Sequence, residues 1–468
     1  MLRIFAPGSA ARSTLSRREC LRVGGALGLS WLGLQQARAA EPAIAPAKRG
    51  SSFGKAKACI VLFLAGGPPQ HETWDPKPEA SSDIRGPLGT IKSSLPGLHV
   101  GELMPKLAAQ AHKWSILRAV RTNDNAHSAS GYYMLTGRPH SPKNQENATA
   151  KDPNLWPCLG AIANRLLPHR SALPNAVTLP EHVWNTGMIP WPGQDAGLMG
   201  RAYDPWLLHC DPNEPQFNIS GLALPEGVSQ LRLNDRLAMH KQLDNHLSRF
   251  ARIRDTEQQD VWTKTAVDLL GSNGPRRAFN LDEEKAEVRD RYGRHRFGQS
   301  VLLARRLVEA GVSLIQVNWT RDKDGNNDSP MWDTHKDHIH YLKNKLMSPM
   351  DAASSALIDD LSERGLLDET LVVWMGEFGR TPKFNAGGGR DHWGNVFSIA
   401  MAGGGIRPGI VHGSSDAMGA EPKDGMVTPE NIMATIYHCL GISPQATFDD
   451  LQGRPLHIKH GEEIRAIL

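Results

Sequence analysis

The sequence predicts an α/β protein built on a largely parallel β-sheet. Three apolar, β-branched runs are each long enough for one buried strand, and they are residues 58–65, 311–319 and 370–375. Helical patterns lie between these runs, and alternation of buried strands with helices is typical of parallel sheets. Polar residues follow the ends of the predicted strands, which is where open α/β sheets bind their ligands.

The composition is that of an ordinary globular protein, with 40% hydrophobic and 22% charged residues. A length of 468 residues is long for one core, so we expect one large domain with insertions or two domains. The formal net charge is +4, but residues 1–39 hold six Arg and one Glu, which leaves −1 for the rest. A nearly neutral chain has no general attraction to nucleic acid or to an anionic membrane.

The first 39 residues resemble an export signal. Arg17 and Arg18 form a twin-arginine pair, residues 23–34 are apolar, and an Ala-Arg-Ala cleavage pattern ends at Ala39. The apolar run is shorter than the roughly 20 residues that span a bilayer. We therefore expect cleavage, passage through the twin-arginine translocation machinery to the periplasm or the exterior, and no stable membrane insertion. An uncleaved N-terminal anchor is the alternative.

Four cysteines follow this signal, and they are Cys59, Cys158, Cys210 and Cys439. None forms a C-x-x-C pair, so a zinc ribbon is not expected. Export would permit disulfides. Cys59 begins an apolar run and Cys439 lies in an apolar helical pattern, so these two are predicted to be buried thiols.

The first half of the predicted domain, residues 58–468, follows a Pro- and Ala-rich linker over residues 40–57. An insertion occupies about residues 139–310, loop-rich to about 229 and mostly helical beyond. The other elements expected before residue 180 are a helix over 102–114, strands over 115–120 and 176–179, and a helix that ends at Thr136 before Gly137.

The second half of the domain continues the alternation after the strand at 311–319. The patterns predict helices over 348–365 and 429–440, a strand over 396–402 and a short extended segment over 410–412. Residues 322–328 are rich in Asp and faintly resemble a calcium loop. They lack the terminal Glu at the required offset, so a plain turn is expected there.

Three potential metal ligands follow the first predicted strand within five positions, and they are His71, Glu72 and Asp75. A random loop seldom concentrates His, Glu and Asp in this way, which favours a functional role at the strand end. The alternative is a turn that Asp75 and Pro76 initiate.

His127 and Ser128 follow the strand predicted over 115–120, at the predicted start of the next helix. A helix N-terminus favours anions and anionic transition states, so both residues are candidates for catalysis. Equally, both could simply cap the helix, because Ser is a preferred cap.

Two further strand ends carry mixed carboxylates and imidazoles. Asp333 and His335 follow the strand at 311–319, and Glu377, Asp391 and His392 follow the strand at 370–375. The alternative for Glu377 and its neighbours is a helix-capping acid and a solvated loop.

Carboxyl ends of parallel strands share one edge of a sheet, so all of these clusters are expected to converge. The predicted metal ligands are His71, Glu72, Asp75, Asp333, His335, Glu377, Asp391 and His392. Mixed carboxylate and imidazole ligands suit one or two divalent ions, Zn, Mn or Fe rather than Ca. Two such ions would clamp the attacking and leaving oxygens of a displacement. Arg380 or Arg138 could hold the remaining anionic oxygens.

Several motifs together resemble one family. They are the twin-arginine signal, GGPPQHETWDPKP, HSASGYYMLTGRP, WDTH, GEFGRTP and GGRDHW. The chain looks like the bacterial domain of unknown function 1501 family, which is abundant in planctomycetes and is placed in the alkaline phosphatase/sulfatase superfamily. The resemblance covers nearly all of residues 58–468. The family has no settled biochemical activity.

The superfamily implies a three-layer α/β/α sandwich with an alkaline phosphatase-like core and a two-metal site. Its nucleophile position falls on His127, with Ser128 as the neighbouring alternative. His127 could instead be a ligand, or form a phosphohistidine, or the site could use a metal-bound water.

The carry-over of the metal ligands is partial. The superfamily's first-strand Asp falls near Gly66, so His71, Glu72 or Asp75 would substitute. Asp333 and His335 match its Asp/His element with altered spacing. Glu377 stands where the superfamily has Asp, Phe378 stands where it has the adjacent His, and His392 matches its last His.

A formylglycine sulfatase is disfavoured. Cys210 begins the C-x-P-x-R pattern of those enzymes, but Glu214 stands where the Arg is required. The resemblance and the clusters together predict an exported metal-dependent hydrolase of a phosphate or sulfate ester, on a small molecule or a polysaccharide. The alternatives are a non-catalytic exported glycan- or metal-binding protein on the same fold and a phosphomutase-like transferase.

Overall fold

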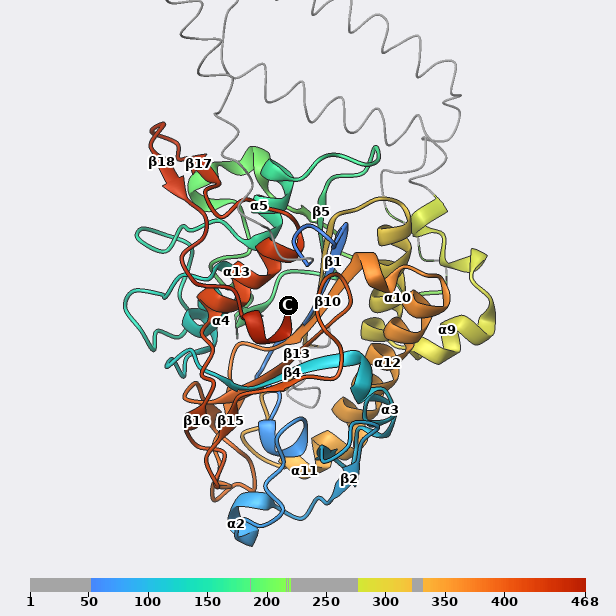
Figure 1. The fold of residues 1–468 in the computed structure, drawn as a ribbon, viewed down its shortest axis with the longest axis vertical. Coiled ribbons are helices and arrows are strands. Elements are labelled where there is room, and N and C mark those ends of the chain that lie inside the picture. The colour runs from blue at the N-terminus through green and yellow to red at the C-terminus, as the bar shows by residue number, and fades with distance from the viewer. Residues whose placement is uncertain (1–51, 186, 216, 218, 220–276, 322–330) are drawn as a thin grey trace, which may run out of the picture. The chain divides into compact units, whose positions relative to one another are not determined.

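An eight-stranded sheet lies at the centre of the protein, in the order β14-β4-β13-β10-β1-β9-β5-β8 (Figure 1). Its strands are β1 (Ala58–Leu64), β4 (Trp114–Val120), β5 (Ala176–Leu179), β8 (Trp206–Leu207), β9 (Leu314–Trp319), β10 (Thr370–Met375), β13 (Phe397–Ala402) and β14 (Val411–His412). Central β1 is parallel to both β9 and β10. Of these eight strands, β13 alone runs against its neighbours. The predicted largely parallel sheet is therefore confirmed.

The structure is a computed structural model that describes residues 52–468 except 186, 216, 218, 220–276 and 322–330. The predicted export signal, most of the linker, most of the helical part of the insertion and the Asp-rich turn at 322–328 lie outside the described residues. None of the helices in the described part of the chain has the length and apolarity needed to cross a bilayer.

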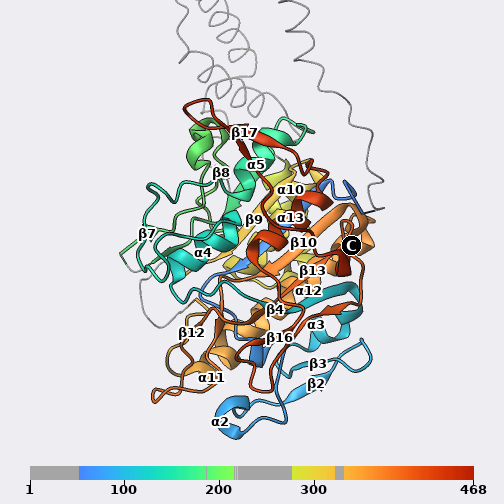
Figure 2. The same ribbon diagram turned by 60° about the vertical axis from the view of Figure 1, so that its left-hand side comes forward.

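Strand β1 sends alternate side chains into two hydrophobic cores, because successive residues of a strand point to opposite faces. Ile60 and Leu62 lie in one core, and Val61 and Phe63 lie in the other. The first core is covered by α3 (Pro105–Ala109), α9 (Ala286–Tyr292), α10 (Arg296–Glu309) and α12 (Met347–Glu363). The second is covered by α4 (His127–Thr136), α5 (Leu159–Leu166) and α13 (Pro429–Cys439) (Figures 1 and 2). The predicted three layers are therefore present.

Some predicted elements differ in extent from the observed ones. The helix predicted over 102–114 is only α3 followed by a 3-10 turn at Ala111–Lys113, because Pro105 starts the helix late and Gln110 ends it. Helix α5 was not predicted, since its eight residues lie in a loop-rich stretch with prolines on both sides. Cys59 and Cys439 are buried free thiols, as predicted, and burial raises the pKa of Cys439 to about 12.

Short elements complete the described chain. The short strands are β2 (Thr90–Lys92), β3 (His99–Gly101), β6 (Trp184–Asn185), β7 (Ile189–Pro190), β11 (Gly379–Arg380), β12 (His392–Trp393), β15 (Ser414–Ser415), β16 (Pro422–Asp424), β17 (Thr447–Asp449) and β18 (Pro455–His457). The short helical elements are η1 (Gln70–Glu72), α2 (Ser82–Arg85), η3 (Gly197–Met199), η4 (Arg201–Tyr203), η5 (Leu281–Glu283), α11 (His338–Tyr341), η6 (Leu342–Leu346), η7 (Leu367–Glu369) and η8 (Arg465–Ile467). In both ribbon views α2, α11 and β16 gather at the lower end of the sheet, the end where β1 leads into η1 (Figures 1 and 2).

Candidate metal centre

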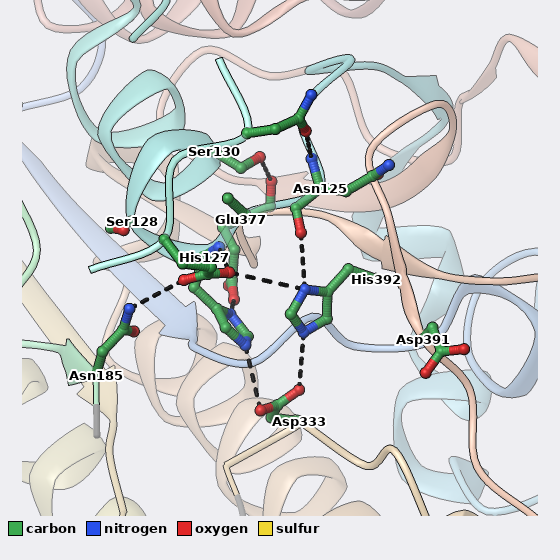
Figure 3. Close-up of polar contacts among 12 residues, drawn as sticks. Asn125, His127, Ser128, Ser130, Asn185, Asp333, Glu377, Asp391 and His392 are labelled. Carbon is green, nitrogen blue, oxygen red and sulfur yellow. Dashed lines mark hydrogen bonds and ion pairs between the residues drawn. The ribbon is translucent and has the colours of Figure 1, made fainter. Parts of the chain in front are cut away.

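Side chains from the segments that follow three strands of the sheet, β4, β9 and β10, form one polar cluster at its carboxyl edge (Figure 3). Glu377 follows β10 after one glycine, and His127 is the first residue of α4, after β4. Asp333 follows β9 along the chain. His392 lies in β12, which pairs with β11 so that Arg380 stands opposite His392. This hairpin explains how the GEFGRTP and GGRDHW motifs meet.

Asp333 lies at the middle of the cluster. Its Oδ1 accepts a hydrogen bond from Arg380 Nη2 at 2.8 Å and lies 3.1 Å from His392 Nε2 and 2.9 Å from His335 Nε2. Its Oδ2 lies 3.2 Å from His127 Nε2. Burial favours the neutral acid, but the charges of His127 and then Arg380 outweigh it and hold the pKa of Asp333 well below its usual range.

His127 lies between two carboxylates. Its Nδ1 is 2.7 Å from Glu377 Oε1, and its Nε2 faces Asp333 without the alignment of a hydrogen bond (Figure 3). The imidazole is enclosed by the rings of Trp191 and Phe378, at centroid distances of 5.6 and 5.0 Å. Burial lowers the pKa of His127, but Asp333 and then Glu377 outweigh it and raise the pKa to about 9. Without metal, this imidazole is therefore protonated at neutral pH.

Glu377 is fully buried and is held at the end of β1. The backbone N–H of Gly66 donates to its Oε1 at 2.8 Å, whereas its Oε2 is buried without a hydrogen-bond partner. Gly66 has a φ of +112°, and a Cβ there would lie 2.5 Å from the backbone of Trp332 and Asp333. Only glycine therefore lets the end of β1 approach both Glu377 and the segment that carries Asp333.

His335 and His392 face each other on the exposed side of Asp333. Their Nε2 atoms are 2.9 Å apart, His335 Nδ1 is 2.8 Å from Asp391 Oδ1, and His392 Nδ1 donates to the carbonyl of Asn125 at 2.7 Å. The hydrogen bond to Asp333 raises the pKa of His335. Burial, followed by the charges of His127 and Arg380, lowers the pKa of His392 to about 4. Contact with His335 lowers the pKa of Asp391.

Glu146 is a member of the cluster that the sequence analysis missed. Its Oε1 accepts the backbone N–H of His127 at 2.6 Å and lies 3.8 Å from His392 Nδ1, and its Oε2 accepts from Asn185 Nδ2 at 3.0 Å. Glu146 lies in a loop well beyond α4, and no neighbouring residue type marks it as a ligand. Nothing in the local pattern could have identified it.

The donor set fits a divalent metal ion. Ligand atoms of Asp333, His335 and His392 lie within 4.8 Å of one another, as do those of His127, Glu146 and His392. Two imidazole nitrogens point at one carboxylate oxygen, and Glu377 Oε2 has no partner, an arrangement that costs free energy until a cation or proton joins it. Imidazole and carboxylate together suit Zn, Mn or Fe.

The predicted convergence of every cluster is corrected by the structure for His71, Glu72 and Asp75. His71 Nε2 is 2.7 Å from the carbonyl of Met418, and Asp75 pairs with Lys77 at 3.1 Å. Glu72 is bound by Arg390 and His338, at 2.6 and 3.4 Å. These three residues follow β1 by several positions, so η1 carries their side chains beyond the edge that Gly66 occupies. All three contact other protein groups, and within the described residues His71 Nδ1 and Glu72 Oε2 have no hydrogen-bond partner.

Ser128 and Arg380 are also engaged by the protein. Ser128 is buried, and its Oγ donates to the carbonyl of Gln145 and accepts from the N–H of Ala148, both at 3.0 Å. Neither His127 nor Ser128 caps α4, because the helix begins at His127 and no side-chain cap is present.

Arg380 has no exposed side-chain surface. Besides Asp333, its guanidinium donates to the carbonyls of Gly66, Gly67, Trp332 and Arg390. Arg138, the other guanidinium considered for anion binding, lies 4.8 Å over the ring of Trp156. The arrangement around Arg380 joins the ends of β1 and β10 to the Asp333 segment, so its role is to position Asp333.

Comparison with solved structures finds similar proteins at low identity. A crystal structure of Ps i-CgsB is 12% identical with a TM-score of 0.39 and covers 82% of this chain and 72% of that chain. PsFucS1 sulfatase from Pseudoalteromonas sp. is 12% identical with a TM-score of 0.38, covering 82% and 68%. A protein in the alkaline phosphatase superfamily from Vibrio parahaemolyticus is 10% identical with a TM-score of 0.33, covering 85% and 74%.

No curated protein matches the chain in sequence. A family model matches residues 56–468, which is nearly the whole described chain. The motifs that place Glu377, Arg380 and His392 around Asp333 all lie within that match. The chain therefore belongs to the DUF1501 family, described as proteins of unknown function.

Proposed function

We propose that the protein is a metal-dependent hydrolase of phosphate or sulfate esters. The observation that carries this proposal is the convergence of Asp333, His335 and His392 at the carboxyl edge of the sheet, where His127 lies between Asp333 and the buried carboxylate of Glu377. Imidazole and carboxylate ligands in a partly exposed position suit a divalent transition-metal ion. The chemistry that a divalent ion supplies in such a site is activation of water and neutralisation of developing charge.

The chain's own residues would hold and orient the reacting groups. Asp333, His335 and His392 provide ligand atoms, and Arg380 keeps the Asp333 carboxylate in place. Asn125 fixes the ring of His392 by accepting its Nδ1–H, which leaves Nε2 directed at the centre. Glu377 holds Nδ1 of His127 in the same way.

The contacts at the superfamily's nucleophile position favour direct attack by water. Both ring nitrogens of His127 face carboxylates. The hydroxyl of Ser128 is engaged by the backbone, and that of Ser130 donates to the carbonyl of Glu377 at 2.7 Å. A phosphomutase-like transferase requires a phosphorylated side chain, and trapping such an adduct on His127 or Ser128 would revive that alternative.

A non-catalytic binding protein is the second candidate function. It is favoured by Phe378, whose ring stacks on His392 with centroids 4.6 Å apart, at the position where the superfamily has a metal-binding His. A centre with one ligand fewer can hold a metal or a glycan without turnover. The distinguishing result is saturable ligand binding with no hydrolysis.

The test begins with metal analysis of the natively purified protein, followed by a panel of phosphate, sulfate and phosphonate esters. His392→Ala should lose bound metal and lower turnover at least roughly 100-fold, since even groups behind a metal ligand contribute 10- to 100-fold. His340→Ala is the matched control, because His340 is exposed on nearby α11. Bound metal without cleavage of any ester in the panel would contradict the proposed activity.

We also propose that the chain is exported and that its substrate is a small molecule or a polysaccharide ester. The twin-arginine pattern at Arg17 and Arg18 supports export. Replacing both arginines by lysine should retain the protein, uncleaved, in the cytoplasm. Cell fractionation measures this, and unchanged export of the double variant would refute it.

A further inference from the structure

An ester anion at the centre needs a cationic partner, and the two arginines first considered for it are occupied. Arg380 is fully buried, and its guanidinium donates hydrogen bonds to backbone carbonyls and to Asp333. Arg138 packs over Trp156. An anion at the centre would therefore need a third guanidinium at the same edge of the sheet.

Arg321 lies there, two residues beyond the end of β9. Its Nη2 is 3.7 Å from Asp333 Oδ2, an ion pair too long for a hydrogen bond, and its Nε is buried without a hydrogen-bond partner among the described residues. The side chain is 22% exposed. An unpaired buried guanidinium nitrogen carries a desolvation cost that a bound anion would remove.

Asp333 does not need Arg321 for its own neutralisation. Arg380 donates to it at 2.8 Å and His127 lies at 3.2 Å, both closer than Arg321. Arg321 approaches Oδ2, whereas His335 and His392 approach Oδ1. The guanidinium thus borders the candidate metal ligands from the opposite side of the carboxylate.

We propose that Arg321 binds the anionic oxygens of the phosphoryl or sulfuryl group that the centre acts on. The inference rests on the proposed function and supplies the anion-binding residue that it lacks. A guanidinium presents paired N–H groups that match two oxygens of a phosphate or sulfate. Arg321 is accordingly a substrate-binding residue, and Arg380 is a positioning residue.

The test measures binding of inorganic phosphate and inorganic sulfate to the metal-loaded full chain by calorimetry. Arg321→Ala should raise the dissociation constant of the bound anion roughly 10- to 100-fold, as expected for a lost charge-assisted hydrogen bond. Metal content should stay unchanged. Added guanidinium ion should restore part of the binding to Arg321→Ala, which a merely structural role would not produce.

Arg121→Ala is the matched control. Arg121 follows β4 at the same edge, is 32% exposed and pairs with Glu421 at 3.5 Å, so its surroundings resemble those of Arg321. Its loss should leave anion binding unchanged. If Arg321→Ala does not fold, Arg321→Lys provides the test, because lysine keeps the positive charge but lacks the paired N–H groups of the guanidinium. A dissociation constant for Arg321→Lys equal to that of the wild type would refute the proposal.

The outcomes separate this inference from the proposed function. If Arg321→Ala weakens phosphate or sulfate binding but the wild type cleaves no ester, the role of Arg321 in anion binding is supported and the proposed hydrolase activity is contradicted. If wild type and Arg321→Ala cleave an ester with the same KM, the proposed hydrolase activity is supported and the role of Arg321 in anion binding is contradicted. Failure of the wild type to bind either anion, or parallel loss of metal from Arg321→Ala, also overturns the role of Arg321.

Discussion

Two polar clusters lie at the same end of the sheet and use the same residue types, yet only one of them is exposed to solvent. The candidate metal centre surrounds Asp333, and its His335 and Asp391 side chains are 43% and 54% exposed. The second cluster, Glu72 with Arg390 and His338, has side-chain exposures of 1% or less. The presence of carboxylate and imidazole side chains therefore does not by itself distinguish a candidate ligand-binding cluster from one that stabilises the fold.

Arg390 makes the difference in the second cluster. Its Nε and Nη2 both donate to Glu72 Oε1, at 3.1 and 2.6 Å, and Nη2 also reaches the carbonyl of Ile84 at 2.7 Å. Its Nη1 donates to the carbonyl of Thr381 at 2.9 Å. The guanidinium thus neutralises Glu72 and ties the β11–β12 loop to η1 and α2. A buried charge that is paired and hydrogen-bonded in this way supports the fold. The other oxygen of Glu72, Oε2, is buried 3.4 Å from His338 Nε2 and has no hydrogen-bond partner among the described residues.

The largest expected effect concerns the exposed cluster. Asp333→Asn removes the carboxylate on which His335, His392 and Arg380 converge, so metal binding should be lost and turnover should fall roughly 10⁴-fold, or about 5.5 kcal/mol of transition-state stabilisation. Metal analysis and ester hydrolysis measure both. Asp337→Asn, an exposed neighbour in a left-handed conformation that Asn tolerates, should change neither. Full metal occupancy in Asp333→Asn would show that the centre is elsewhere.

The next effect concerns the buried cluster. Arg390→Ala leaves Glu72 as an unpaired buried charge and should lower the free energy of unfolding by about 3–5 kcal/mol. Urea denaturation measures this. Arg294→Ala removes the exposed ion pair between Arg294 and Asp290. It should lower the free energy of unfolding by less than about 1 kcal/mol. If the two variants lost the same free energy of unfolding, the buried cluster would not stabilise the fold more than an exposed ion pair does.

The smallest effect is a pH dependence of stability. Burial raises the pKa of Glu72, but Arg390 and then His338 outweigh it and lower the pKa to about 2, below the 4.5 of an unperturbed Glu. Because the folded pKa is depressed, the stabilisation by ionised Glu72 is complete above about pH 4.5 and is lost as the pH falls toward 2. Glu72→Gln should flatten this part of the profile of urea midpoints against pH. Glu79→Gln, an exposed neighbour, should follow the wild type, and an unchanged profile in Glu72→Gln would contradict the assignment.

The fold was largely readable from local pattern. The bounds predicted for β5 and β10 match the structure, and α4 ends at Thr136 before a left-handed Gly137 as expected. Buried parallel strands are recognisable in the sequence as apolar runs, and a glycine often marks the C-terminal end of a helix. Helix α5 was missed because eight residues between prolines give too short a periodic signal.

The site was readable only in part. Glu377 and His127 are predictable because Glu377 follows a strand after one glycine and His127 begins the helix that comes after a strand, and strand ends of a parallel sheet share an edge. Glu146 could not be found, since its link to His127 depends on the path of a loop. Their roles as ligands stay a prediction until metal is measured.

The sequence by itself determined the parallel sheet, the edge at which the polar residues of the candidate site gather, and the chemical character of those residues. Only the tertiary structure decided which carboxylates remain open, because that depends on arginines distant along the chain: Arg390 lies 318 residues from Glu72, and Arg380 lies 47 from Asp333. Periodicity reports which face of an element is buried, whereas charge pairing between loops depends on three-dimensional proximity. Glu72 and Glu377 are equally plausible ligands in the sequence, and the guanidinium bound to Glu72 separates them in the fold.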